Sequence, residues 1–133
     1  MYDPNTILLK GESSVSTDEL EWEQKSLAGL TDKMLFRNEE TGATIALIRF
    51  EKGTGMPIKH EHASNQFLYI LSGVYQLGDD PGIVLKPGDF YSNRKGNFHS
   101  PSVALEETVF LEIYDGPHYP SRPEFYDNDE DAR

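Results

Sequence analysis

The segment Gly55-Met-Pro57-Ile-Lys-His60-Glu-His62-Ala-Ser-Asn-Gln66-Phe-Leu-Tyr-Ile-Leu71-Ser-Gly73 contains two histidines separated by a single residue. Side chains at positions i and i+2 of a β-strand lie on the same face, so the imidazoles of His60 and His62 can converge on one ion. The apolar run 67–71, closed by Gly73, is typical of a second strand. The segment therefore predicts short strands that carry a histidine pair.

A third histidine, His99, follows the turns Lys86-Pro-Gly-Asp89 and Asn93-Arg-Lys-Gly96. An antiparallel return strand could bring it beside the pair, so His60, His62 and His99 together predict a metal site. The alternative is that these histidines are polar residues of half-buried strands. The chain has no cysteine, so imidazole, amide, carboxylate and water are the only ligands available to a metal.

The rest of the chain alternates short apolar runs with turns that contain glycine or proline. This spacing predicts an all-β barrel or sandwich, and helical periodicity is weak. We expect an N-terminal arm over residues 1–32 that packs on the barrel, a barrel over 33–115 and an acidic tail over 116–133. The expected strands lie at 34–37, 43–50, 67–71, 74–77, 83–85, 90–92, 97–100 and 108–114.

Length and charge limit the possible functions. The chain has 133 residues, enough for one domain with a core, and a net charge of −11. So acidic a chain repels phosphate backbones, which argues against nucleic acid as a partner. No apolar run approaches transmembrane length and the start is no signal peptide, so we expect a soluble cytoplasmic protein with no membrane partner.

Two runs resemble the two conserved motifs of the cupin superfamily, the RmlC-like jelly rolls. Gly55-x4-His60-x-His62-x3-Gln66-x6-Gly73 resembles the first motif, with glutamine in place of the usual glutamate. Residues 87–99 resemble the second motif, with Lys95 where proline is common. The residues around 36–42 and 47–50 are similar to the subgroup with the zinc cupin domains of anti-sigma factors and 2,4'-dihydroxyacetophenone dioxygenase. The resemblance implies an all-β fold, the cupin double-stranded β-helix or jelly-roll barrel.

The resemblance also implies a divalent metal ion held by His60, His62 and His99, with Gln66 at the fourth position. Fe(II) is the metal we favour, with zinc, manganese or nickel as alternatives. Gln66 either binds the metal weakly through its carbonyl oxygen or orients a bound water or substrate by hydrogen bonding, and we favour the second role. Gln66 and Tyr91 are the candidate catalytic residues.

Two functions remain open at this stage. The first is a mononuclear Fe(II) dioxygenase that acts on a small enolisable or aromatic ketone. Three neutral histidines leave the full charge on the ion, which favours an anionic chelating substrate. The second is a non-catalytic metal- or ligand-binding cupin with a sensing or regulatory role. A metal-independent sugar epimerase of the same fold would not need the histidines. For either function we expect a homodimer, the commonest oligomer.

Overall fold

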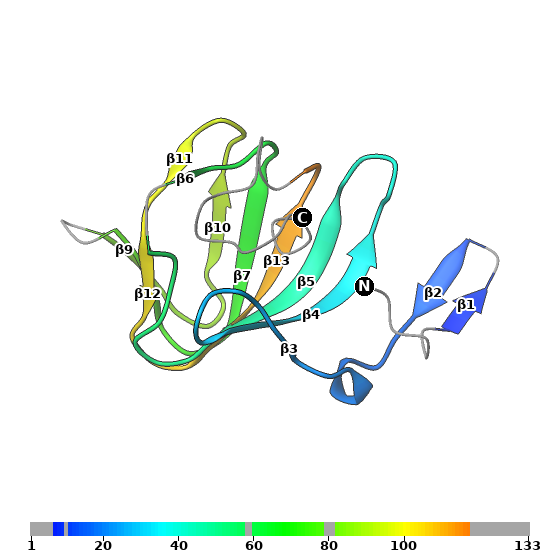
Figure 1. The fold of residues 1–133 in the computed structure, drawn as a ribbon, viewed down its shortest axis with the longest axis horizontal. Helices are drawn as coiled ribbons and strands as arrows, with labels where there is room; N and C mark the ends of the chain where they lie inside the picture. The colour runs from blue at the N-terminus through cyan, green and yellow to red at the C-terminus, as the bar shows by residue number, and fades with distance from the viewer. Residues whose placement is uncertain (1–6, 10, 58–59, 79–81, 118–133) are drawn as a thin grey trace.

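The computed structural model describes residues 7–9, 11–57, 60–78 and 82–117, where the regular secondary structure is all β-strand apart from one 3-10 helix, Thr17–Glu19. The strands join into antiparallel sheets, as expected for a jelly-roll barrel (Figure 1). Among these residues no helix has the length and apolar character that a membrane span requires. The strands are β1 (Ile7–Leu9), β2 (Glu12–Ser14), β3 (Glu23–Gln24), β4 (Leu30–Arg37), β5 (Thr44–Phe50), β6 (His60–Glu61), β7 (Gln66–Ser72), β8 (Tyr75–Leu77), β9 (Ile83–Leu85), β10 (Phe90–Asn93), β11 (Phe98–His99), β12 (Ser102–Ala104) and β13 (Thr108–Tyr114).

Two sheets face one another across the core. The larger has the strand order β10-β7-β13-β5-β4-β3, and the smaller has the order β12-β8-β9. Strict alternation of buried and more exposed residues along β5 and the first half of β7 gives the larger sheet one buried, mainly apolar inner face. Tyr75 of the smaller sheet stacks on Phe50 at 5.6 Å between ring centroids and tilts against Phe110 at 5.1 Å. These three aromatic rings join the two sheets.

Two glycines of the first motif hold positions where a side chain would clash. A Cβ on Gly55 would strike the backbone carbonyl of Ser102, on the strand β12. Gly73 has φ of 86°, in the left-handed region that favours glycine, and a Cβ there would strike the carbonyl of Glu107. Both glycines therefore allow the smaller sheet to approach the rest of the barrel.

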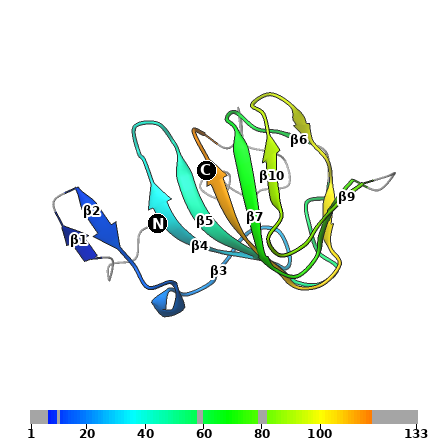
Figure 2. The ribbon, with the colours of Figure 1, turned by 180° about the vertical axis from the view of Figure 1, so that it is seen from behind.

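The outer face of the larger sheet is covered unevenly. Trp22, just before β3, lies against β4 and β5, with Lys33 Nζ 4.7 Å and Arg49 Cζ 4.4 Å from its ring centroid. Such cation–π contacts tie the N-terminal segment to the sheet. The β1–β2 hairpin projects away from the barrel in both ribbon views (Figures 1 and 2).

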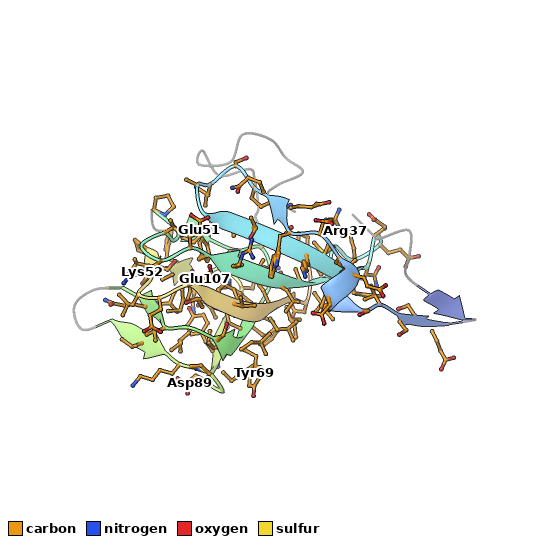
Figure 3. All side chains as sticks on the ribbon, turned by 90° about the horizontal axis from the view of Figure 1, so that it is seen from below. Arg37, Glu51, Lys52, Tyr69, Asp89 and Glu107 are labelled. Carbon is orange, nitrogen blue, oxygen red and sulfur yellow. The ribbon has the colours of Figure 1, made fainter. Side chains whose placement is uncertain are left out.

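The other end of the same face is apolar, and its large side chains are exposed. Leu68 and Ile70 of β7 are buried inside the barrel, while Tyr69 and Leu71 are 43% and 48% exposed on the outside, as the alternation predicts. Figure 3 shows Tyr69 at the margin of the molecule. Phe90 of β10, the direct cross-strand partner of Tyr69, is 64% exposed.

Candidate functional site

Strands β6 and β11 bring the histidine motifs together at one end of the barrel. They pair antiparallel, with His60 directly opposite His99 and Glu61 opposite Phe98. The Gly96 N–H then donates to the His62 carbonyl at 3.1 Å, which continues the pairing by one step. In Figure 1 this pair lies at the end of the barrel where β7 begins and β10 ends. The backbone thus places the predicted ligands of the two motifs side by side.

The predicted ligand set itself is only partly described. Glu61 is exposed and His62 is 2% exposed, so these neighbours face opposite ways, as expected for a strand. The side chains of His60 and His99 lie outside the described residues, and their convergence with His62 stays a prediction. Among the side chains that are described, no three histidine or carboxylate groups gather as a metal cluster.

His62 belongs to a buried polar cluster with residues of β7 and β13. Gln66, the first residue of β7, is directly opposite Tyr114, the last residue of β13, and both are 3% exposed. The Tyr114 hydroxyl lies 3.4 Å from His62 Nε2, and the two rings are 5.0 Å apart. A contact of 3.4 Å is at the long limit of hydrogen bonding, so this imidazole nitrogen is not held in a strong bond with Tyr114.

The amide of Gln66 has a defined orientation. Its Nε2 donates to Glu112 Oε2 at 2.9 Å and to the Tyr114 hydroxyl at 3.0 Å. Its Oε1 is buried and has no hydrogen-bond partner among the described residues. An unsatisfied buried acceptor is costly and rare in folded proteins. The site therefore presents a carbonyl oxygen that a bound group could engage.

Glu112 stands directly behind this amide, on the inner face of β13. Its cross-strand partners are Leu68 on one side and Ala46 on the other. Burial of the carboxyl group raises its pKa from 4.5 to about 7, and the nearby Asp32 adds to the increase. The hydrogen bonds from Gln66 and Tyr114 act in the opposite direction but do not outweigh the loss of solvation.

Two residues of β10 line the same inner face. Asn93 is directly opposite Gln66, and its buried Nδ2 likewise has no hydrogen-bond partner among the described residues. Tyr91, predicted as a catalytic residue, lies opposite Leu68 and packs against the core. Burial raises its pKa, so its hydroxyl stays protonated at neutral pH. Its catalytic role stays a prediction.

Asn65 braces the loop between His62 and Gln66. Its backbone N–H and its Nδ2 donate to the two carboxylate oxygens of Asp115, at 2.9 and 2.8 Å. Its Oδ1 accepts the backbone N–H of Lys95 at 2.8 Å. One side chain thus joins the ends of β13 and β10 to the loop that carries His62, and it fixes the entry into β7.

Sequence reasoning missed Glu112, Tyr114, Asn65 and Asn93. A signal for the first two was present, because alternation along Thr108–Tyr114 puts positions 108, 110, 112 and 114 on one face with the buried Phe110. Asn65 and Asn93 gave no such signal, since their roles depend on loop contacts and on strand register.

The donor set suits a divalent metal. A buried carbonyl oxygen with no hydrogen-bond partner in the described part of the chain lies in one cluster with a buried imidazole, and two more histidines are directly opposite one another on the adjoining strand pair. Nitrogen ligands and a neutral oxygen are compatible with Fe(II) or Zn(II). We therefore regard the residues present as fitting a mononuclear metal ion.

Comparisons with known proteins agree with the fold. A protein proposed to be an acetylacetone dioxygenase, from Methylibium petroleiphilum, aligns with a TM-score of 0.73 at 18% identity, covering 85% of this chain and 83% of its own. An acetylacetone dioxygenase from Acinetobacter johnsonii aligns with a TM-score of 0.67 at 17% identity, covering 88% and 81%. An RmlC-like cupin from Shewanella frigidimarina aligns with a TM-score of 0.65 at 23% identity, covering 84% and 93%. At these identities the likeness shows the fold alone.

No curated protein sequence matches the chain. The sequence profile of the ChrR cupin-like domain, however, matches residues 10–118, which is most of the chain. The match includes both histidine motifs and the strands β2 to β13. The chain therefore belongs to the ChrR cupin-like domain family.

Proposed function

We propose that this cupin is a mononuclear metal enzyme, an Fe(II) dioxygenase that acts on a small enolisable or aromatic ketone. His60, His62 and His99 would hold the ion. Two of the structural neighbours are described as acetylacetone dioxygenases, and acetylacetone is a small enolisable ketone. Because the sequence identities are low, these neighbours support the proposal only through the shared fold.

The burial and hydrogen bonding of Gln66 give the main support for the proposal. Gln66 is 3% exposed, its Nε2 donates to Glu112 and Tyr114, and its Oε1 has no hydrogen-bond partner within the part of the chain that the structure describes. A structural glutamine in a closed core would have its carbonyl satisfied. A carbonyl acceptor held in this way can orient a bound water or a substrate hydroxyl by accepting a hydrogen bond from it.

The remaining chemistry belongs to the chain's own residues. When bound, the ion supplies a Lewis-acid centre and, as Fe(II), a route for electrons to O₂. Gln66 Oε1 accepts a hydrogen bond from the enol or water that enters the site. Tyr91 keeps its proton at neutral pH on the same face. The apolar side chains of Leu68 and Ala46 are buried on either side of Glu112.

The test combines metal analysis with oxygen uptake. The protein is purified without added metal, its metal content is measured, and O₂ consumption is followed against a panel of 1,3-diketones and aromatic ketones. We expect iron in about equimolar amount and O₂ uptake that depends on one class of ketone. Tightly held zinc with no turnover by the iron-reconstituted protein would overturn the dioxygenase proposal and would leave a non-catalytic metal-binding cupin.

A further inference from the structure

We propose that Glu112 supplies the carboxylate that position 66 lacks, and that it stabilises the bound cation through Gln66. This inference rests on the proposed metal site. The amide at position 66 contributes a dipole without a charge, and three neutral histidines add none. A carboxylate nevertheless lies 2.9 Å from that amide, on the neighbouring strand. The negative charge is therefore placed behind the amide, one hydrogen bond further from the histidine end.

The orientation of the amide follows from Glu112. An ionised carboxylate only accepts hydrogen bonds, so the NH₂ group of Gln66 must face it. Tyr114 occupies the second N–H of that group at 3.0 Å. The flipped amide would place its carbonyl oxygen against carboxylate oxygen, which is unfavourable. The carbonyl oxygen is therefore directed away from Glu112, with the negative end of the amide dipole free.

The hydrogen bond between Gln66 and Glu112 is similar to the one that many metal-binding histidines make to a carboxylate. There a carboxylate accepts a hydrogen bond from the ligand and makes the ligand more basic, and its removal typically lowers metal affinity about 10- to 100-fold. Here Glu112 polarises the Gln66 amide in the same way. The carboxylate is partly buried on the inner face of the sheet, where solvent screens its charge less than at the surface. Glu112 thus acts as a positioning residue through Gln66.

Metal affinity tests the inference without relying on turnover. Co²⁺ binding is measured at pH 8 by competition with a chromophoric chelator, for the full chain and for three variants whose folding is checked by circular dichroism. Glu112→Gln removes the charge and keeps the shape, and we expect affinity to fall about 10- to 100-fold. The double variant Gln66→Glu with Glu112→Gln exchanges the two groups, and we expect affinity at or above that of the unmodified protein.

Asp32→Asn is the matched control. Asp32 is another buried carboxylate of the inner face, paired with Lys25 at 3.4 Å, and it makes no hydrogen bond to Gln66. We expect this variant to bind Co²⁺ within about twofold of the unmodified protein, because Asp32 has no hydrogen bond to Gln66 through which to act on the cation.

Three results would overturn the inference. Unchanged affinity in Glu112→Gln would show that the carboxylate does not act on the cation. An equal loss in Asp32→Asn would show a general effect of interior charge. Failure of the double variant to bind Co²⁺ would show that a carboxylate at position 66 cannot replace the one at position 112. If Glu112→Gln alone does not fold, the double variant provides the test. Absence of Co²⁺ binding by the unmodified protein would instead overturn the proposed metal site itself.

Discussion

Glu112 has opposite effects on stability and on the proposed site. Its buried carboxyl group resists ionisation, since burial raises its pKa from 4.5 to about 7. Ionisation of this group therefore costs folding free energy in the metal-free protein. The same ionised group is what the proposed cation site requires. A residue that is destabilising alone and useful with a bound cation is typical of functional sites.

The pH dependence of stability follows from this shift. Between about pH 4.5 and about pH 7 the folded chain keeps a proton on Glu112 that the unfolded chain has released. The free energy of unfolding therefore falls as pH rises through this window, by up to about 3 kcal/mol. Urea unfolding of the metal-free protein at pH 5 and pH 8 measures the fall, and we expect Glu112→Gln to show much less of it.

Asp32, a second carboxyl group near Glu112, also contributes to the pH dependence of stability. The pKa of Asp32 is also raised, mainly by burial and against the attraction of Lys25, so Asp32 contributes a fall of the same sign. The unmodified protein and Glu112→Gln both keep Asp32, His62 and Tyr114. The difference between their falls in unfolding free energy therefore reports on Glu112. Identical pH profiles for the two proteins would contradict the assignment.

At the scale of elements, the departure at Lys95 from the second motif has a structural reason. The Asn97 N–H donates to the Arg94 carbonyl at 3.1 Å, which closes a turn with Lys95 at its second position, where proline is favoured. In this chain, however, the Lys95 N–H is used, because it donates to Asn65 Oδ1. Proline would suit the turn but would remove that donor.

A double-mutant cycle tests this reading of Lys95. Lys95→Pro should lower the free energy of unfolding when Asn65 is present and should have little effect or stabilise in an Asn65→Ala background. We expect a coupling energy of about 0.5–1 kcal/mol, the value of one exposed hydrogen bond. Lys95→Ala, which keeps the N–H, is the control and should show no coupling. Strict additivity of Lys95→Pro and Asn65→Ala would exclude the hydrogen bond as the reason.

The sequence predicted the long strands better than the short ones. Alternation along residues 66–71 predicts Leu68 and Ile70 inward and Tyr69 and Leu71 outward, and the structure confirms both. The strand Ser102–Ala104 was missed, because three residues are too few for a period to be visible. The two-residue strands β3, β6 and β11 are stabilised by their partners and not by their own composition.

The candidate site was predictable only in part for a related reason. The first motif gives His60, His62 and Gln66, which lie close together in sequence, and the second motif gives His99. Glu112 and Tyr114 lie 46 and 48 positions beyond Gln66, and only strand register brings them to it. Register depends on the pairing of whole strands, which a single motif does not encode.

At the scale of the whole molecule, we propose that a second copy covers the bare end of the outer face. The N-terminal segment already covers β4 and β5 through Trp22, and the uncovered end carries Tyr69, Leu71 and Phe90. In a chain of net charge −11 this uncharged patch stands out as a contact surface. A symmetric pair of such faces is the simplest closed assembly.

Analytical ultracentrifugation tests the dimer. We expect a mass of about twice the 15.1 kDa chain, and a shift to the single-chain mass when Phe90→Glu puts a charge in the patch. Val84→Glu, on the 46% exposed outer side of the smaller sheet, is the matched control and should leave the dimer intact. A single-chain mass for the unmodified protein, or an equal effect of both variants, would contradict the proposal.

The proposed site holds one metal ion at the histidine end of the barrel, beside an amide that donates to Glu112. A crystal structure of the iron- or cobalt-loaded protein, with anomalous diffraction recorded at the metal edge, tests it most directly. We predict one anomalous peak bonded to His60, His62 and His99, with Gln66 Nε2 still on Glu112 and Gln66 Oε1 on the side of the peak. A metal bound elsewhere, or Gln66 turned so that its oxygen meets Glu112, would contradict the account.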